Sequence, residues 1–131
     1  MTSLPDGLFN NSKELFILEL KNNQLVDDGI PPNTFHADEL DLSGNNLTTL
    51  KKEWFGVIKY EVKVNDNPIH CDCILYETYR VLMNRTDEDD FMLIGKCVSP
   101  PHLKGKELED VYGNNLINCT ACSLNLSLIH I

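Results

Sequence analysis

Cysteines are the residues of this chain whose type and spacing could do chemistry, and two of its five stand in the stretch NPIHCDC at residues 67–73. Cys71 and Cys73 are separated by one residue. They cannot easily bridge to each other, because a disulfide needs Cα atoms about 4.4–6.8 Å apart with converging Cβ atoms. Each therefore needs a partner elsewhere, and the candidates are Cys97, Cys119 and Cys122.

Zinc binding is the main rival to a disulfide role here, because His70 precedes the two cysteines directly. Structural zinc sites usually space their cysteines about two to four residues apart and repeat the pair, which C-x-C does not do. None of the four histidines belongs to a nucleophile or metalloprotease motif, and no phosphate-binding glycine loop is present. The sequence therefore predicts no catalytic residue, no metal ligand and no cofactor, and it disfavours an enzyme.

The charge and hydropathy of the chain restrict its partners. The 131 residues suffice for about one domain, and the net charge is −9. Nucleic acids and anionic membranes attract clusters of Lys and Arg, so neither is expected as the main partner. No export signal and no stretch of roughly 18 apolar residues is visible. We expect any membrane attachment to come through a transmembrane segment missing from this chain.

Glycosylation triplets point to the secretory pathway. Asn-x-Ser/Thr begins at Asn10, Asn46 and Asn84, and again at Asn118, where the middle residue is a cysteine. Chance alone can produce one or two such triplets, but clustered cysteines point the same way. We therefore expect an extracellular protein, with glycans at the first three sites and an export signal upstream.

A 22-residue repeat organises the first half of the chain. LFILELKNNQL (15–25), ADELDLSGNNL (37–47) and KYEVKVNDNPI (59–69) share the pattern L-x-x-L-x-L-x-x-N-x-L, with Ala37 and Lys59 as departures in the first place. The asparagines Asn23, Asn45 and Asn67 stand 22 residues apart. Scattered leucines, or isolated strands of a sandwich, would not be expected to keep this spacing through three copies.

Each position of the repeat has a physical reason. Side chains alternate along a strand, so Leu18 and Leu20 can point inward while Glu19 points out. An asparagine amide, both donor and acceptor, can satisfy the backbone of a buried turn. The irregular segments between the strands carry apolar residues expected to fill the convex side: Leu4, Leu8, Phe9, Ile30, Phe35, Leu50, Trp54 and Phe55.

This pattern resembles the leucine-rich repeat. The stretch NPIHCDC, followed by KCVSPPHLKGKEL and LINCTAC, resembles the cysteine-rich C-terminal flanking cap of extracellular leucine-rich repeat proteins. The resemblance implies an α/β solenoid of leucine-rich repeat coils with short parallel strands, closed by a disulfide-bonded helical C-terminal cap. Four cysteines allow three connectivities, and spacing alone does not choose among them. In the family the first cysteine bridges to the third and the second to the fourth, which implies Cys71–Cys97 and Cys73–Cys119.

The organisation expected from these motifs has three parts. Residues 1–66 form a partial first coil and about three repeats, residues 67–122 form the cap, and residues 123–131 form a tail. Within the cap, apolar residues recur with helical spacing over CILYETYRVLMN (73–84). This stripe predicts a helix that lies across the last coil, and its members are Leu75, Tyr79, Leu82 and Met83.

Both ends of the chain are expected to be cut. Residues 126–131, LSLIHI, are what the transposase mosaic end used in sequencing libraries, CTGTCTCTTATACACATC, encodes when read in frame. We therefore expect adapter sequence to interrupt the native protein near Asn125, Met1 to be an internal methionine, and Cys122 to have lost its partner. A genuine apolar tail is the alternative.

Within the family, the chain most resembles an arthropod Toll receptor ectodomain, in which a cap of the form NPIHCDC is followed closely by further cysteines. Here CTAC places Cys122 three residues after Cys119. The resemblance implies a fragment of a Toll-like receptor ectodomain that binds a protein ligand for innate-immune or developmental signal transduction. A secreted or cell-surface leucine-rich repeat adhesion or matrix protein is the alternative, because a fold does not specify a function.

The outward positions of the repeat strands are mostly acidic. A like-charged concave surface can attract a basic patch on a partner, although exposed charge also serves solubility. We expect the protein ligand to contact Glu19, Glu39, Asp41 and Glu61. The whole strip comprises Glu19, Lys21, Asp38, Glu39, Asp41, Glu61, Lys63 and Asp66.

Overall fold

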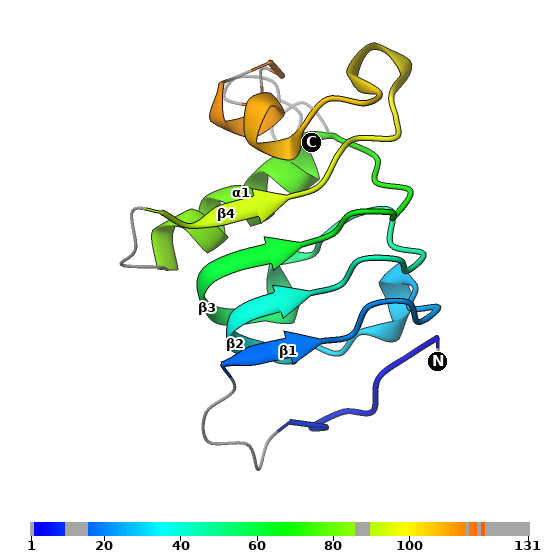
Figure 1. Cartoon of the computed structure of the whole chain (residues 1–131), viewed down its shortest axis with the longest axis vertical. Coiled ribbons are helices and arrows are strands. Elements are labelled where there is room, and N and C mark those ends of the chain that lie inside the picture. Colours follow the sequence, from blue (N-terminus) through cyan, green and yellow to red (C-terminus); the bar gives the residue numbers. More distant parts are fainter. Residues whose placement is uncertain (1, 10–15, 86–89, 115, 118, 120–131) are drawn as a thin grey trace, which may run out of the picture.

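A parallel four-stranded sheet in the order β1-β2-β3-β4 forms one side of the molecule (Figure 1). The computed structural model describes residues 2–9, 16–85, 90–114, 116–117 and 119. Besides the sheet, these residues contain the α-helix α1, three 3-10 helices and a short π-helix. The bounds are β1 Ile17–Glu19, η1 Asp27–Gly29, β2 Phe35–Asp41, η2 Lys52–Trp54, β3 Phe55–Lys63, α1 Cys73–Arg85, β4 Met92–Ile94, η3 Pro101–Leu103 and η4 Glu109–Gly113.

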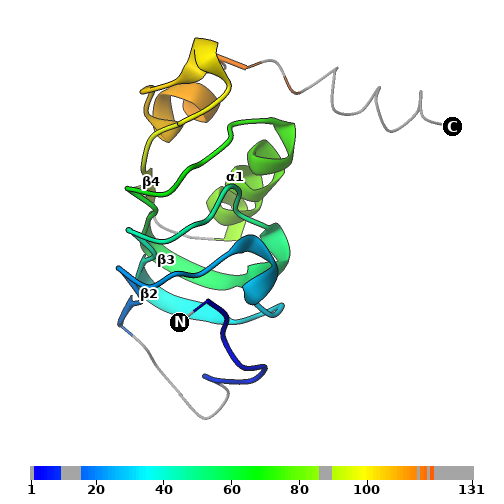
Figure 2. The ribbon, with the colours of Figure 1, turned by 90° about the vertical axis from the view of Figure 1, so that its right-hand side faces the viewer.

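The register of the sheet follows the 22-residue repeat. Leu18 pairs with Leu40 and Leu40 with Val62, so equivalent positions of the three repeats stand side by side. All three side chains are buried. Figure 2 shows the strands along one side of the molecule and the return segments with their short helices on the other. The prediction of parallel strands at these positions agrees with the observed sheet.

Strands β2 and β3 are longer than the sequence pattern predicts. They begin at Phe35 and Phe55, which we expected in irregular convex segments. The register shifts twice between Phe35 and Glu39, and such bulges bend a strand. The bend keeps both phenylalanine rings inside the core, with centroids 5.7 Å apart.

Most of the other predicted core residues are buried, and one is not. Leu4, Ile30, Leu50 and Trp54 are buried, and Phe9 packs against the core. Leu8 is 46% exposed, so its assignment to the core was wrong. Its amide donates to the carbonyl of Pro5 in a surface turn, which directs the side chain toward solvent.

Strand β4 was not predicted from the sequence. Leu93 continues the row of Leu18, Leu40 and Val62, but it lies 31 residues after Val62 rather than 22. The longer interval contains α1, which makes β3-α1-β4 a parallel crossover of the kind that requires a helix-sized connection. The cap region therefore adds a strand to the sheet as well as a helix.

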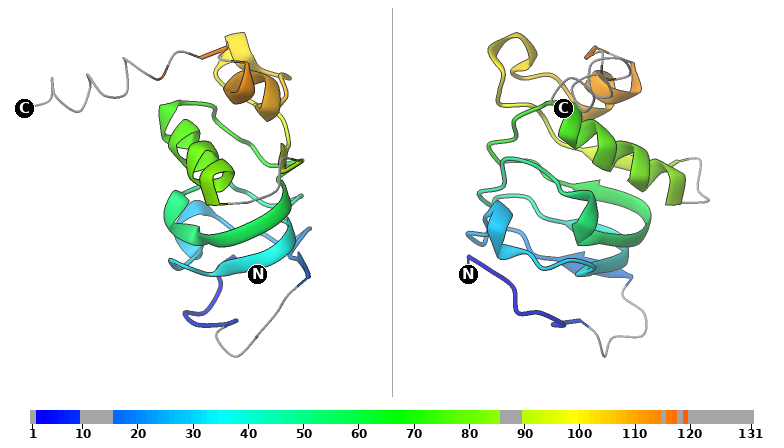
Figure 3. Two further views of the ribbon diagram at one scale, coloured as in Figure 1. Left: turned by 90° about the vertical axis from the view of Figure 1, so that its left-hand side faces the viewer. Right: turned by 180° about the vertical axis from the view of Figure 1, so that it is seen from behind.

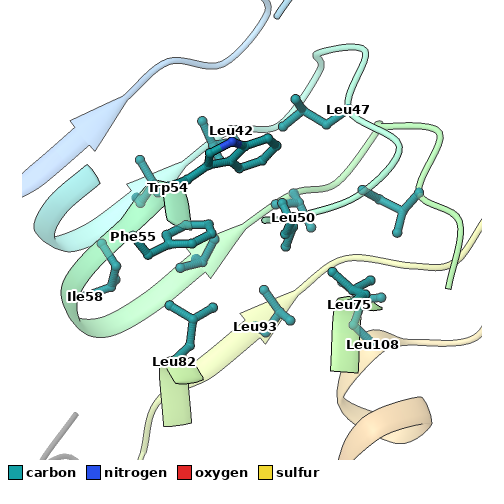
Figure 4. Packing of buried hydrophobic residues seen from close by; sticks show 14 of the residues in the cluster. Leu42, Leu47, Leu50, Trp54, Phe55, Ile58, Leu75, Leu82, Leu93 and Leu108 are labelled. Carbon is teal, nitrogen blue, oxygen red and sulfur yellow. The ribbon is translucent and has the colours of Figure 1, made fainter. Parts of the chain in front are cut away.

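Helix α1 covers the open end of the third repeat. It lies against η2 and β3, and the view from behind in Figure 3 shows it above them. Figure 4 shows Leu75 and Leu82 pointing from α1 into the cluster that contains Leu50 and Phe55. Thr78, which the helical stripe did not include, is buried as well and donates its hydroxyl hydrogen to the Leu50 carbonyl.

The start of α1 is fixed by Asp72. Its Oδ1 accepts hydrogen bonds from the amides of Ile74 and Leu75, both at 3.1 Å, which satisfies two N–H groups that have no partner inside the helix. Among the described residues, no helix combines the length and the hydropathy needed to cross a bilayer.

Candidate functional site

Two of the predicted ladder asparagines connect neighbouring repeats. Asn67 is buried; its Oδ1 accepts from the Leu47 amide at 3.0 Å, and its Nδ2 donates to the carbonyls of Leu42 at 2.9 Å and Val64 at 3.1 Å. Asn45 is also buried and repeats this arrangement one repeat earlier, with Leu25 as donor and Leu20 and Leu42 as acceptors.

Asn23 behaves differently from the other two. Its Nδ2 donates only within its own turn, to the carbonyls of Leu20 at 3.0 Å and Lys21 at 3.4 Å, and the side chain is partly exposed. The same residue type at the same repeat position therefore has a local role at one end of the sheet and a connecting role in the middle.

The structure joins Cys71 to Cys97 and Cys73 to Cys119, with Cα–Cα distances of 5.7 and 5.3 Å. The first bridge ties the turn after the third repeat to the segment that follows β4. The second ties the start of α1 to the end of the described chain. Cys122 lies outside the described residues, as does the stretch 126–131.

A polar network inside the cap was not anticipated from the sequence. Glu109 of η4 accepts a hydrogen bond from the Leu93 amide at 2.7 Å through Oε1 and from the Tyr79 hydroxyl at 3.2 Å through Oε2. It thereby connects β4, α1 and η4. Tyr112 adds a second link, because its hydroxyl donates to the Asp72 carbonyl at 2.9 Å.

Burial of these tyrosines opposes their ionisation. Burial, followed by the neighbouring Glu109 carboxylate, raises the pKa of Tyr79 to about 12. Burial also raises the pKa of Tyr112, with the Asp72 carboxylate acting in the same direction and the hydrogen bond to the Asp72 backbone opposing it. Both groups therefore stay neutral hydrogen-bond donors across the physiological pH range.

The strand face, defined as the outward-pointing residues of β1 to β4, presents two rows of side chains in register. One row contains Ile17, Glu39, Glu61 and Met92, and the other contains Glu19, Asp41, Lys63 and Ile94. The four predicted ligand contacts Glu19, Glu39, Asp41 and Glu61 thus lie on adjacent strands of one face. Glu61 forms an ion pair with Lys63 at 3.4 Å, which partly neutralises the β3 end of the face.

The remaining residues of the predicted acidic strip lie outside these rows. Asp38 lies at the register shift in β2, Lys21 follows the end of β1, and Asp66 is in a turn with φ 58° after β3. Sequence analysis in turn missed the apolar members Ile17 and Met92. Ile17 occupies an outward position that the repeat pattern already marked, whereas Met92 could not be placed without knowing that β4 exists.

The predicted glycan sites differ in what the structure describes. Asn46 is exposed in the turn after β2, and Asn84 is exposed near the end of α1, so both remain predictions for accessible acceptors. Asn10 lies outside the described residues. Within the described part of the chain, no three side chains of the metal-ligating types His, Cys, Asp and Glu come together.

Comparison with known proteins finds no matching family model but several similar curated proteins, which are leucine-rich repeat proteins. Leucine-rich repeat-containing protein 3B of Bos taurus is 29% identical over 87 residues, covering 64% of this chain and 34% of that protein. Lumican of Rattus norvegicus is 37% identical over 68 residues, covering 50% of this chain and 20% of that protein. Toll-like receptor 9 of Mus musculus is 30% identical over 115 residues, covering 82% of this chain and 11% of that protein.

The chain spans about a third or less of the length of these relatives. None of their names denotes an enzyme. Together they support an extracellular leucine-rich repeat protein and do not single out an arthropod Toll receptor.

Proposed function

We propose that this chain is part of an extracellular leucine-rich repeat ectodomain that binds a protein ligand on its strand face. In this proposal residues 1–66 are a short solenoid of repeats, residues 67–122 are its disulfide-bonded cap, and the ectodomain is that of a Toll-like receptor with innate-immune or developmental signalling. Similarity to Toll-like receptor 9 over 82% of the chain supports the receptor assignment.

One observation carries the binding proposal: acidic side chains stand next to each other on an exposed sheet face. Glu39 pairs in register with Glu61, and Glu19 pairs with Asp41. Like charges on adjacent strands repel each other, so this arrangement opposes folding stability. A basic partner would relieve that repulsion and would be attracted from a distance.

Cross-linking tests this proposal on the secreted protein. A photoreactive amino acid at position 39 should capture a specific protein from the surface or medium of cells of the source animal. The same amino acid at position 53, on the exposed 3-10 helix η2, is the control. Equal capture at both positions would contradict the proposal.

The captured partner then allows a charge test. Reversing Glu39 and Asp41 to lysine should slow association and reduce its dependence on ionic strength. Reversing Asp28 and Glu53, two exposed acidic residues on η1 and η2, should leave the association rate nearly unchanged. An unchanged rate after the Glu39 and Asp41 reversals would assign the acidic residues to solvation.

A secreted or cell-surface adhesion or matrix protein is the second candidate. Similarity to lumican and to leucine-rich repeat-containing protein 3B favours it, because neither name denotes a signalling receptor. The full transcript separates the two candidates: a transmembrane segment followed by a cytoplasmic signalling domain supports the receptor, and a stop codon shortly after the cap supports the matrix protein.

A further inference from the structure

The strand face has an apolar residue at each end of its first row. Ile17 on β1 is 58% exposed, and Met92 on β4 is 49% exposed. Between them, on β2 and β3, stand Glu39 and Glu61. The order across the sheet is therefore apolar, acidic, acidic, apolar, and a purely electrostatic surface would not need the two outer side chains.

The two acidic side chains of this row differ in their surroundings. Glu61 has Lys63 as an ion-pair partner. Glu39 forms no ion pair within the part of the chain that the structure describes. A cation arriving over β2 therefore meets a carboxylate whose charge is not yet compensated, and the planar guanidinium of an arginine could bond both carboxylates.

The spacing of the row matches an extended polypeptide that runs across the strands. Neighbouring strands lie about 4.8 Å apart, so the three intervals between β1 and β4 place Ile17 about 14 Å from Met92. An extended chain rises about 3.3 Å per residue, and its residues i, i+2 and i+4 project to the same side. Residues i and i+4 are therefore about 13 Å apart, and i+2 lies between Glu39 and Glu61.

Resting on the proposed function above, we propose that the protein ligand presents an extended segment of the form apolar-x-basic-x-apolar, which crosses the strand face. The outer apolar side chains contact Ile17 and Met92. The central arginine or lysine contacts Glu39 and Glu61. The second row, with Glu19, Asp41 and Lys63, offers the neighbouring polar contacts and limits the positive charge that the segment can carry.

Two synthetic peptides of identical composition test the spacing. The first contains Leu-Ser-Arg-Ser-Leu between glycine–serine flanks, and the second contains Arg-Ser-Leu-Leu-Ser between the same flanks. Each carries a fluorescent label and is titrated with the oxidised, secreted chain. We expect the first peptide to bind at least about fivefold more tightly, because only its leucines can contact both apolar residues at once.

Variants of the protein assign the contacts. Ile17→Ser, Met92→Ser and Glu39→Gln should each weaken the first peptide at least about fivefold, since each removes an apolar contact or a charge-assisted hydrogen bond. Ile17 and Met92 are exposed, so these changes leave the core intact. Val57→Ser is the matched control, because Val57 is also exposed on β3 but lies outside both rows.

The inference is overturned if the two peptides bind equally, if the first peptide does not bind, or if Val57→Ser weakens binding as much as Met92→Ser does. These results leave the proposed function untouched, because that is judged by capture at position 39 with the natural partner. Failure of that capture, with selective binding of the first peptide, would instead show a face that reads this spacing without serving the proposed ligand.

Discussion

Replacing Asn67 with alanine should destabilise the chain far more than replacing Asn23, although both occupy the same place in the repeat. Asn67 accepts from the Leu47 amide and donates to the Leu42 and Val64 carbonyls in a buried turn. The alanine variant leaves the Leu47 amide without this acceptor, which costs about 1–3 kcal/mol for a buried N–H group.

The carbonyl groups add a smaller amount. Leu42 keeps a hydrogen bond from Asn45 at 2.8 Å, so only Val64 loses the side-chain donor that Asn67 supplied. A typical net hydrogen bond is worth about 1 kcal/mol. The expected total for Asn67→Ala is therefore about 2–4 kcal/mol, a large part of the roughly 5–15 kcal/mol that stabilises an ordinary domain.

Asn23→Ala should have an effect of about 1 kcal/mol or less. The Leu20 carbonyl, to which Asn23 donates, also accepts from Asn45 at 3.1 Å, and water can reach the partly exposed turn. Urea denaturation of the oxidised protein measures both free energies of unfolding. Hydrogen exchange should show loss of protection at the Leu47 amide in Asn67→Ala alone. Equal destabilisation by the two variants would refute the assignment of connecting and local roles.

Three further predictions concern the cap and the packing of the first repeat. Replacing Cys73 and Cys119 together by serine opens a loop of sequence separation 46 and should lower the unfolding free energy by about 4 kcal/mol from loop entropy; a change below about 1 kcal/mol in urea denaturation would argue against a stabilising bridge. The pKa of Tyr79 rises from 10.0 to about 12 on folding, so its contribution to stability is complete below pH 10 and is lost as the pH rises through 12; Tyr79→Phe should flatten this part of the curve of urea midpoint against pH, and an unchanged slope would contradict the burial argument. A Cβ at Gly29 would lie 2.3 Å from the Thr2 carbonyl oxygen, so Gly29→Ala should destabilise by about 1–3 kcal/mol through overpacking, and a neutral effect in the same assay would show that the N-terminal segment moves freely.

The repeat spacing made most of the sheet predictable. Positions 22 residues apart in a stack of similar coils must lie side by side, so the repeat pattern alone places Leu18, Leu40 and Val62 in register. The outward acidic residues follow from the alternation of side chains along a strand. The position of Leu75 and Leu82 on the covering face of α1 follows in the same way from helical periodicity.

Other features depend on contacts that no local pattern encodes. β4 lies 31 residues after β3, so a search at the repeat period passes over it, and with it Met92 on the strand face. Glu109 looks like a surface acid until α1 and β4 bring Tyr79 and the Leu93 amide to it. The register shifts that bring Phe35 and Phe55 into strands arise from packing against each other rather than from the alternation of either strand alone.

Peptide mapping of the secreted protein under non-reducing conditions tests the central claim most directly, which is that a disulfide-bonded cap closes an extracellular stack of leucine-rich repeats. The cap assignment predicts one peptide pair joined through Cys71 and Cys97 and another joined through Cys73 and Cys119, as the structure has them. A free thiol at Cys71 or Cys73, or a bridge from either one to Cys122, would contradict it.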